Sequence, residues 1–82
     1  MKLLTKSVHT KDYARFLQLL VEIRKSAGVT QEEVAERLNR HQSFVSKYEN
    51  GERRVDLIEF LEIADAVGFD PVAFIRKIQK SR

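Results

Sequence analysis

The sequence predicts an all-α fold in which five short helices surround one core. Apolar residues recur at three- and four-residue spacing, which is typical of one face of a helix, and capping residues stand directly before most of these segments. No segment alternates polar and apolar residues in the manner of a half-buried strand. The chain has 82 residues, so we expect one domain.

We expect residues 1–9 to form an N-terminal arm, because they show no clear period, and residues 10–82 to form the folded domain. The first helix is expected over about 11–27. Gly28 follows it in the position where a left-handed residue ends a helix. The apolar stripe of this helix consists of Tyr13, Phe16, Leu17, Leu20, Ile23 and Ala27.

A short turn separates the second and third helices. Thr30 caps the second helix, and Glu33 three residues later completes a capping box. The helical pattern then breaks without Pro or Gly, and Asn39 is the residue best suited to a left-handed turn. The third helix is expected over Gln42–Glu49, so that a helix-turn-helix spans about 30–50.

The last two helices begin with caps of the same kind. Asp56 and Glu59 form a second capping box, and Asp70 precedes Pro71 at the first position of the fifth helix. The fifth helix, over 70–79, is apolar on more than one narrow stripe, which suggests a self-association surface. The residues concerned are Val72, Phe74, Ile75, Ile78 and Gln79.

The composition excludes several classes of protein. Lys and Arg total 15 against 12 for Asp and Glu, and the resulting charge of +3 permits nucleic-acid binding without establishing it. There is no cysteine, and the two histidines are too few for a zinc site, so no metal or cofactor is expected. No run approaches the roughly 20 apolar residues that span a bilayer, and we expect a soluble cytoplasmic protein without a membrane partner.

An enzyme is not expected. Ser43 and Ser46 have no histidine and carboxylate constellation around them, and the sequence contains no glycine-rich phosphate loop. A chain of this size also leaves little room for a sizeable pocket.

The outward face of the third helix is its informative side. Ser43, Ser46, Lys47 and Asn50 stand at i, i+3, i+4 and i+7, and Gln42 lies beside them at the start of the helix. Short hydrogen-bonding residues replace the strong helix formers of an ordinary solvated face. Gln suits the edge of adenine, Lys that of guanine, and Ser either, so the face predicts base contacts in DNA. A polar helix without a partner remains the alternative.

Positive charge gathers around this helix at Arg40, Arg53 and Arg54. Gln31 stands at the start of the second helix, where free N–H groups favour a phosphate. His41 is interpreted as a surface residue or a phosphate contact. These side chains are predicted to hold the DNA backbone, which supplies affinity and register.

The segments Gly28–Ala35 and Gln42–Gly51 resemble the phage-repressor helix-turn-helix family, which is lambda repressor and Cro-like and of the XRE type. The resemblance covers about 20–69 and implies a compact lambda-repressor-like domain. It also implies base contacts from Gln42, Ser43 and Lys47. The backbone contacts that it implies come from Gln31 and Asn50.

The resemblance further implies that Arg24 pairs with Glu49 across the core, which would give both charges a structural role. Phe44 departs from the family pattern, since this position is often polar. Two interpretations of Phe44 stay open: it packs beside Tyr48, or it reaches a thymine methyl group.

These features predict a transcriptional regulator that binds an inverted-repeat operator as a homodimer, with half-site centres about 10 base pairs apart or a multiple of that. Repression by occluding a promoter is the simplest mechanism, and activation stays open. The alternative function is a protein-interaction module of the same fold, such as an antitoxin with a toxin as its partner.

Overall fold

The structure is a computed structural model that describes residues 10–82; the predicted arm at 1–9 lies outside the described residues. All the regular elements of the described part are helices, as the sequence predicts. They are α1 (Lys11–Ser26), α2 (Gln31–Leu38), α3 (Gln42–Glu49), α4 (Leu57–Val67) and α5 (Pro71–Ser81).

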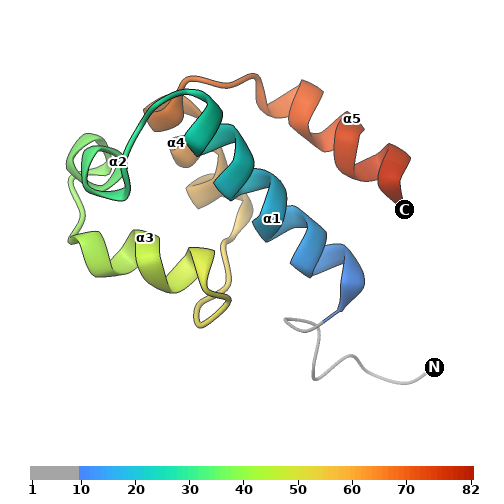
Figure 1. Ribbon diagram of the computed structural model, residues 1–82, viewed down its shortest axis with the longest axis horizontal. Coiled ribbons are helices and arrows are strands. Elements are labelled where there is room, and N and C mark those ends of the chain that lie inside the picture. Colours follow the sequence, from blue (N-terminus) through green and yellow to red (C-terminus); the bar gives the residue numbers. More distant parts are fainter. Residues whose placement is uncertain (1–9) are drawn as a thin grey trace.

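The five helices form one arrangement around α1, which crosses the middle of the molecule (Figure 1). Helix α1 contacts α3 and α5, while α2 contacts α3 and α4, and α4 also contacts α5. Helices α3 and α5 therefore lie toward opposite ends of the molecule (Figure 1). Neither of these two helices covers the outer surface of the other (Figure 1).

The predicted capping boxes at the starts of α2 and α4 are confirmed. The Thr30 hydroxyl accepts from the Glu33 N–H at 3.0 Å, and the Glu33 carboxylate accepts in return from the Thr30 N–H at 2.9 Å. Asp56 and Glu59 exchange the same two bonds at 2.7 and 3.0 Å. A helix cap contributes roughly 1 kcal/mol, a large fraction of the stability of so small a domain.

Two further caps were not expected from the sequence. The Thr10 hydroxyl accepts from the Tyr13 N–H at 3.1 Å and begins α1. The Nδ1 atom of His41 accepts from the Ser43 N–H at 3.2 Å and begins α3. His41 is thus the residue that caps the third helix.

Backbone conformation at the helix ends follows the predicted residues. Gly28 has φ +72°, and Asn39 is the one non-glycine residue with positive φ in the described part, at 56°. Asn39 has ψ 44° and ends α2, so the chain reverses there without a glycine. The left-handed region disfavours most L-residues, and Asn tolerates it because its short amide can bond locally.

The core contains side chains from every helix. Val34, Val45, Tyr48, Ile63 and Phe74 are almost completely buried. Around them the rings of Phe16, Phe60, Phe69 and Phe74 lie with centroids 5.0–5.9 Å apart in tilted, edge and stacked pairs. Such pairs add to the stabilisation that apolar burial gives.

The predicted stripe of α1 needs two corrections. Ala27 is exposed, because the helix ends at Ser26 and Ala27 is its C-cap. Leu19, which the stripe omitted, is only 4% exposed. Because α1 is covered by both α3 and α5, its buried face is wider than one stripe.

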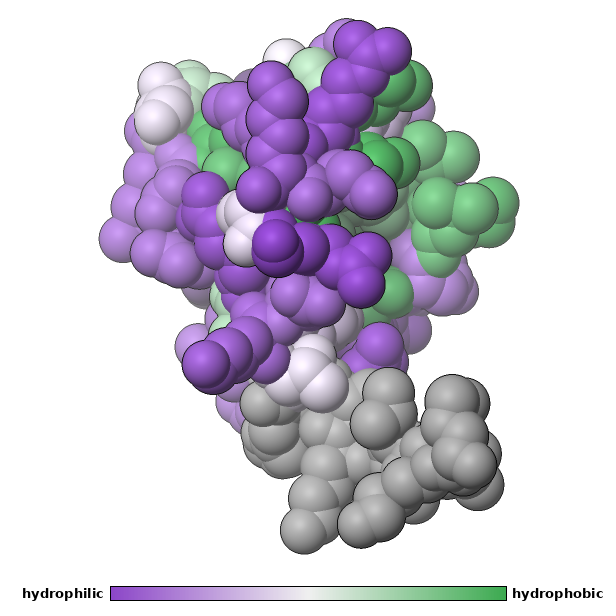
Figure 2. Space-filling model, turned by 90° about the vertical axis from the view of Figure 1, so that its right-hand side faces the viewer, coloured by the Kyte–Doolittle hydropathy of each residue, from purple (hydrophilic) through white to green (hydrophobic). Residues whose placement is uncertain are grey.

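An exposed apolar area extends over α4 and α5. It comprises five side chains that we call the α4–α5 patch: Leu57, Ile58, Leu61, Val72 and Ile75, which are 39–64% exposed. Figure 2 views the end of the molecule that carries α5, and there green apolar side chains gather beside a mostly purple surface. Leu57 and Ile75 also line a groove together with Phe16, Phe60 and Gln79.

The broad apolar character of the fifth helix therefore has two causes. Phe74 and Ile78 face inward, with Phe74 in the core and Ile78 packed against it, whereas Val72 and Ile75 remain exposed. Leu57, Ile58 and Leu61 on α4 extend this surface, and the sequence did not predict their part in it.

The left-handed turn at Asn39 yields a prediction. Asn39→Val should lower the free energy of unfolding by about 1–2 kcal/mol, because a β-branched side chain is strained at positive φ. Asn39→Gly should leave stability unchanged or raise it slightly, since glycine adopts this conformation without strain. Urea denaturation of both variants measures the difference, and equal stabilities would contradict the assignment of strain to this position.

Candidate nucleic-acid interface

The turn between α2 and α3 is held by backbone hydrogen bonds. The Asn39 N–H donates to the Glu36 carbonyl at 3.0 Å, and the Arg40 N–H donates to the Ala35 carbonyl at 2.9 Å. Ala35 is 3% exposed, and its small side chain lets the two helices pack closely. Val45 and Tyr48 fix the inner side of α3, so the orientation of its outer side is determined.

The outer side of α3 carries the predicted base-reading residues. Gln42, Ser43 and Lys47 are exposed, as is Asn50 at the C-cap. Ser46 is half-buried, and its hydroxyl donates to the Ser43 carbonyl at 3.2 Å within the helix. Ser46 is therefore less available to a partner than the other four side chains.

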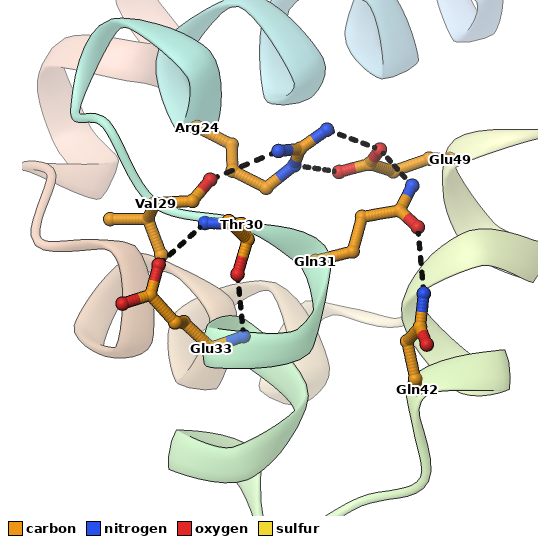
Figure 3. A network of polar contacts seen from close by, with 7 residues as sticks. All are labelled: Arg24, Val29, Thr30, Gln31, Glu33, Gln42 and Glu49. Atoms are coloured by element: carbon orange, nitrogen blue, oxygen red, sulfur yellow. Dashed lines mark hydrogen bonds and ion pairs between the residues drawn. The ribbon is translucent and has the colours of Figure 1, made fainter.

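A buried ion pair ties α1 to α3, as the resemblance implied. The Nε and Nη2 atoms of Arg24 donate to the Glu49 carboxylate at 2.7 and 3.1 Å, and Nη1 donates to the Val29 carbonyl at 2.9 Å (Figure 3). The two side chains are only 11% and 5% exposed. The hydrogen bond to Glu49 raises the pKa of Arg24, so the guanidinium stays charged.

The same carboxylate reaches the first residue of α3 through one intermediate side chain. The Gln31 amide donates to Glu49 Oε1 at 2.8 Å, and its oxygen accepts from the Gln42 amide at 3.4 Å (Figure 3). A chain of hydrogen bonds thus runs from Arg24 in the core to Gln42 on the surface. This chain restricts the orientation of the Gln42 amide.

Two of the basic residues around α3 contact the same carboxylate, that of Glu59, and the same aromatic ring, that of Phe44. Arg53 donates from Nη1 and Nη2 to the two oxygens of Glu59 at 2.9 and 2.7 Å, and Arg40 lies 3.6 Å from the second oxygen. The guanidinium carbons of Arg40 and Arg53 lie 4.3 and 4.8 Å from the centroid of the Phe44 ring. We call Arg40, Phe44, Arg53 and Glu59 the arginine cluster.

The charges of the arginine cluster stabilise one another. The hydrogen bonds from Arg53 lower the pKa of Glu59 to about 2, and the same bonds raise the pKa of Arg53. Sequence reasoning assigned Glu59 only to the cap of α4 and missed its pairing with two arginines. Arg40 reaches Glu59 from the turn between α2 and α3, and no local sequence pattern indicates that these two residues meet.

The structure shows where the side chain of Phe44 packs. The residue is 9% exposed, and its ring centroid lies 5.4 Å from that of Tyr48 in an edge arrangement. With Arg40 and Arg53 over the ring as well, the interpretation that Phe44 packs beside Tyr48 is confirmed.

The last predicted basic residue lies apart from the arginine cluster. The guanidinium of Arg54 lies 4.4 Å from the ring of Tyr13, on α1. The Tyr13 hydroxyl in turn accepts from the Val55 N–H at 3.2 Å. Arg54 therefore adjoins the start of α1.

Within residues 10–82, none of the helices combines the length and apolar character needed to cross a membrane.

The low pKa of Glu59 predicts how stability depends on pH. The carboxylate has a pKa of about 2 in the folded protein against an ordinary value of 4.5, so it contributes stability above pH 4.5 that is lost as the pH falls toward 2. The free energy of unfolding of Glu59→Gln should therefore decline less over this interval than that of the native protein. Urea denaturation at a series of pH values measures both curves.

Glu62→Gln is the matched control, since Glu62 is an exposed carboxylate on the same helix without the two arginines. It should follow the native pH profile. If the Glu59→Gln profile also runs parallel to the native one, the ion pair does not carry the acid dependence.

Comparisons with known proteins agree with this geometry. A family described as a helix-turn-helix domain matches residues 12–74. An XRE-family like protein from Pseudomonas syringae pv. tomato str. DC3000 is 49% identical, with a TM-score of 0.86 and 94% of each chain covered. A point mutant of the restriction-modification controller protein C.Esp1396I shares the fold at 22% identity, with a TM-score of 0.78 over 88% of this chain and 91% of that one.

No curated protein matches the chain. The helix-turn-helix match covers most of the sequence, and the XRE-family like protein is similar over nearly its whole length. The chain therefore belongs to the helix-turn-helix domain family and is of the XRE type.

Proposed function

We propose that this helix-turn-helix protein is a transcriptional repressor that binds an inverted-repeat operator as a homodimer. The observation that carries the proposal is the outer side of α3, where short hydrogen-bonding side chains are exposed on a helix whose inner side is fixed by buried residues. A helix of this kind fits the major groove of B-DNA, whose base edges present distinct donors and acceptors. The fold is typical of non-enzymatic DNA-binding proteins.

In this proposal Gln42, Ser43 and Lys47 read base edges. One of the two amide N–H groups of Gln42 donates to Gln31. The other N–H can donate to N7 of an adenine, and the amide oxygen can accept from its N6 amino group. Lys47 suits the O6 and N7 atoms of guanine, and the Ser43 hydroxyl suits either donor or acceptor edges. Ser46 supports this face from within the helix.

Contacts to the DNA backbone are assigned to the residues that flank α3. Arg40 and Arg53 provide charge beside the start of the helix, while Arg54 provides it beyond the end. His41 caps α3 through Nδ1, which leaves Nε2 to carry a proton toward a phosphate. Further contacts come from Gln31 and Asn50. They fix the register of the protein on the duplex.

The base-reading assignment yields a prediction for Lys47→Ala. Selection of bound duplexes from a random pool should give a palindromic consensus for the native protein, and the variant should lose preference at one position of each half-site. The loss corresponds to about 1–3 kcal/mol of discrimination.

Lys77→Ala removes the same charge from an exposed position on α5 and is the matched control. It should leave the consensus unchanged. If no sequence is enriched by the native protein and its affinity barely responds to salt, DNA reading by α3 is refuted.

The proposed dimer uses the α4–α5 patch. A patch of large apolar side chains on a monomer of this size marks an interaction surface. Helix α5, which carries part of the patch, lies away from α3 (Figure 1), so a dimer formed through α5 would leave both recognition helices uncovered. A two-fold symmetric dimer pairs the same surface of both subunits, so one patch on each suffices. Such a dimer would present its two α3 helices to major grooves one helical turn apart, a separation of about 34 Å.

Ile58→Glu tests this surface. The residue is 62% exposed in the first turn of α4, where a carboxylate suits the helix dipole, so the fold should persist. Burying the new charge in the interface should weaken self-association by about 2 kcal/mol or more. Sedimentation should show a shift toward monomer, and affinity should fall more for a two-half-site duplex than for a single half-site.

Ala73→Glu places the same carboxylate in the first turn of α5 at an exposed position outside the patch, and it should leave the dimer intact. Dissociation by both variants alike, or by neither, would argue against the α4–α5 patch as the dimer surface.

The second candidate is a protein-interaction module, such as an antitoxin. The same α4–α5 patch favours it, because an apolar surface of this kind also suits a different protein. A native protein that is monomeric and enriches no duplex would support this candidate over the repressor.

A further inference from the structure

The arginine cluster holds two guanidinium groups beside the start of α3. Arg40 stands two residues before Gln42, and Phe44 lies in the first turn of the helix. The Phe44 ring contacts both guanidiniums, and Glu59 contacts both from α4. The cluster is thus built from the α2–α3 turn, α3, the loop after α3, and α4. It adjoins the predicted base-reading residues.

The hydrogen bonds of Arg53 leave one edge of its guanidinium open. Two of its five N–H donors bond Glu59, and a third bonds the Arg54 carbonyl at 2.9 Å. The Nε–H and the second Nη2–H remain, and they lie on the same edge. Two adjacent donors on a planar guanidinium suit two oxygens of a phosphate.

Arg40 is held less tightly and is the more accessible of the two cations. Within residues 10–82 its only ion pair is the 3.6 Å contact with Glu59, and its side chain is 43% exposed. The Phe44 ring supports the guanidinium from one side at 4.3 Å. A cation that is already oriented loses less conformational entropy when it binds an anion.

Two guanidiniums and one carboxylate give the arginine cluster a net charge of +1. The low exposure of the Glu59 side chain, 11%, keeps its charge close to both arginines and away from solvent screening. Toward a distant phosphate the cluster therefore acts as one positive charge, although it contains two cations.

We propose that the arginine cluster is a preorganised contact site for the DNA backbone. Glu59 limits sequence-independent affinity by holding the net charge of the site at +1, so that the cluster neutralises one phosphate where two unpaired arginines would neutralise two. The inference rests on the proposed DNA binding and names a residue that sets its strength. Each neutralised phosphate steepens the dependence of affinity on salt, so the charge of the site is measurable as a slope.

Glu59→Gln is the first test. Gln retains the capping geometry of α4, because Gln and Glu both serve at this position of a capping box. The variant raises the charge of the site by one, so the slope of log K against log salt should steepen by about 0.9. At about 0.15 M salt this corresponds to roughly five-fold tighter binding, on the selected operator and on a scrambled duplex alike. Glu62→Gln makes the same change of charge elsewhere on α4 and should alter neither quantity.

Arg40→Ala tests the site without touching the cap of α4. The slope should become shallower by about 0.9 on both duplexes, whereas Lys77→Ala should leave it unchanged. The double variant Arg40→Ala with Glu59→Gln restores the net charge of the site and should return the slope close to the native value. Urea denaturation of each variant establishes that it is folded under the binding conditions.

The outcomes separate this inference from the function on which it rests. Suppose that the native protein binds DNA in a salt-dependent way. Unchanged slopes for folded Glu59→Gln and Arg40→Ala then overturn the phosphate site but not the repressor proposal. Weaker binding of folded Glu59→Gln to both duplexes overturns the limiting role of Glu59. A native protein that binds neither duplex refutes the proposed function itself.

Discussion

The buried pairing of Arg24 with Glu49 is the constraint on which the rest of the structure depends. A charged group in a core is costly unless its partner and its hydrogen bonds are all present, and here the Val29 carbonyl and the Gln31 amide complete the set. The pair fixes α3 against α1, and the Val29 contact fixes the chain that enters α2. These interactions therefore set the orientation of α3. A single substitution in the pair would leave the other charge buried without its partner, at a cost of about 3 kcal/mol or more.

Around this pair the molecule carries two surfaces with different chemistry. The surface at α3 is polar and holds the arginine cluster, whereas α4 and α5 present the apolar patch. Glu59 connects the two, since it caps α4 and also binds the arginines beside α3. The same helix thus contributes a carboxylate to one surface and leucine and isoleucine side chains to the other.

Local chemistry made much of this fold predictable. The capping boxes, the left-handed Asn39 and the bounds of α3 follow from neighbouring residues, and the exposed face of α3 follows from helical spacing. The pairing of Arg24 with Glu49 came only from a family resemblance, because 25 residues separate the two. The arginine cluster and the part of α4 in the apolar patch depend on how distant segments pack, which sequence spacing alone does not encode.

The separation between the fixed inner side of α3 and its exposed outer side has a consequence for evolution. Ser43 and Lys47 are exposed, and no core contact depends on them. Exposed positions of this kind tolerate substitution with little change in stability. Under the proposed function, operator preference can therefore diverge among relatives at these two positions while the scaffold is retained. Gln42 is more constrained, because a change there also releases Gln31, which helps to satisfy Glu49.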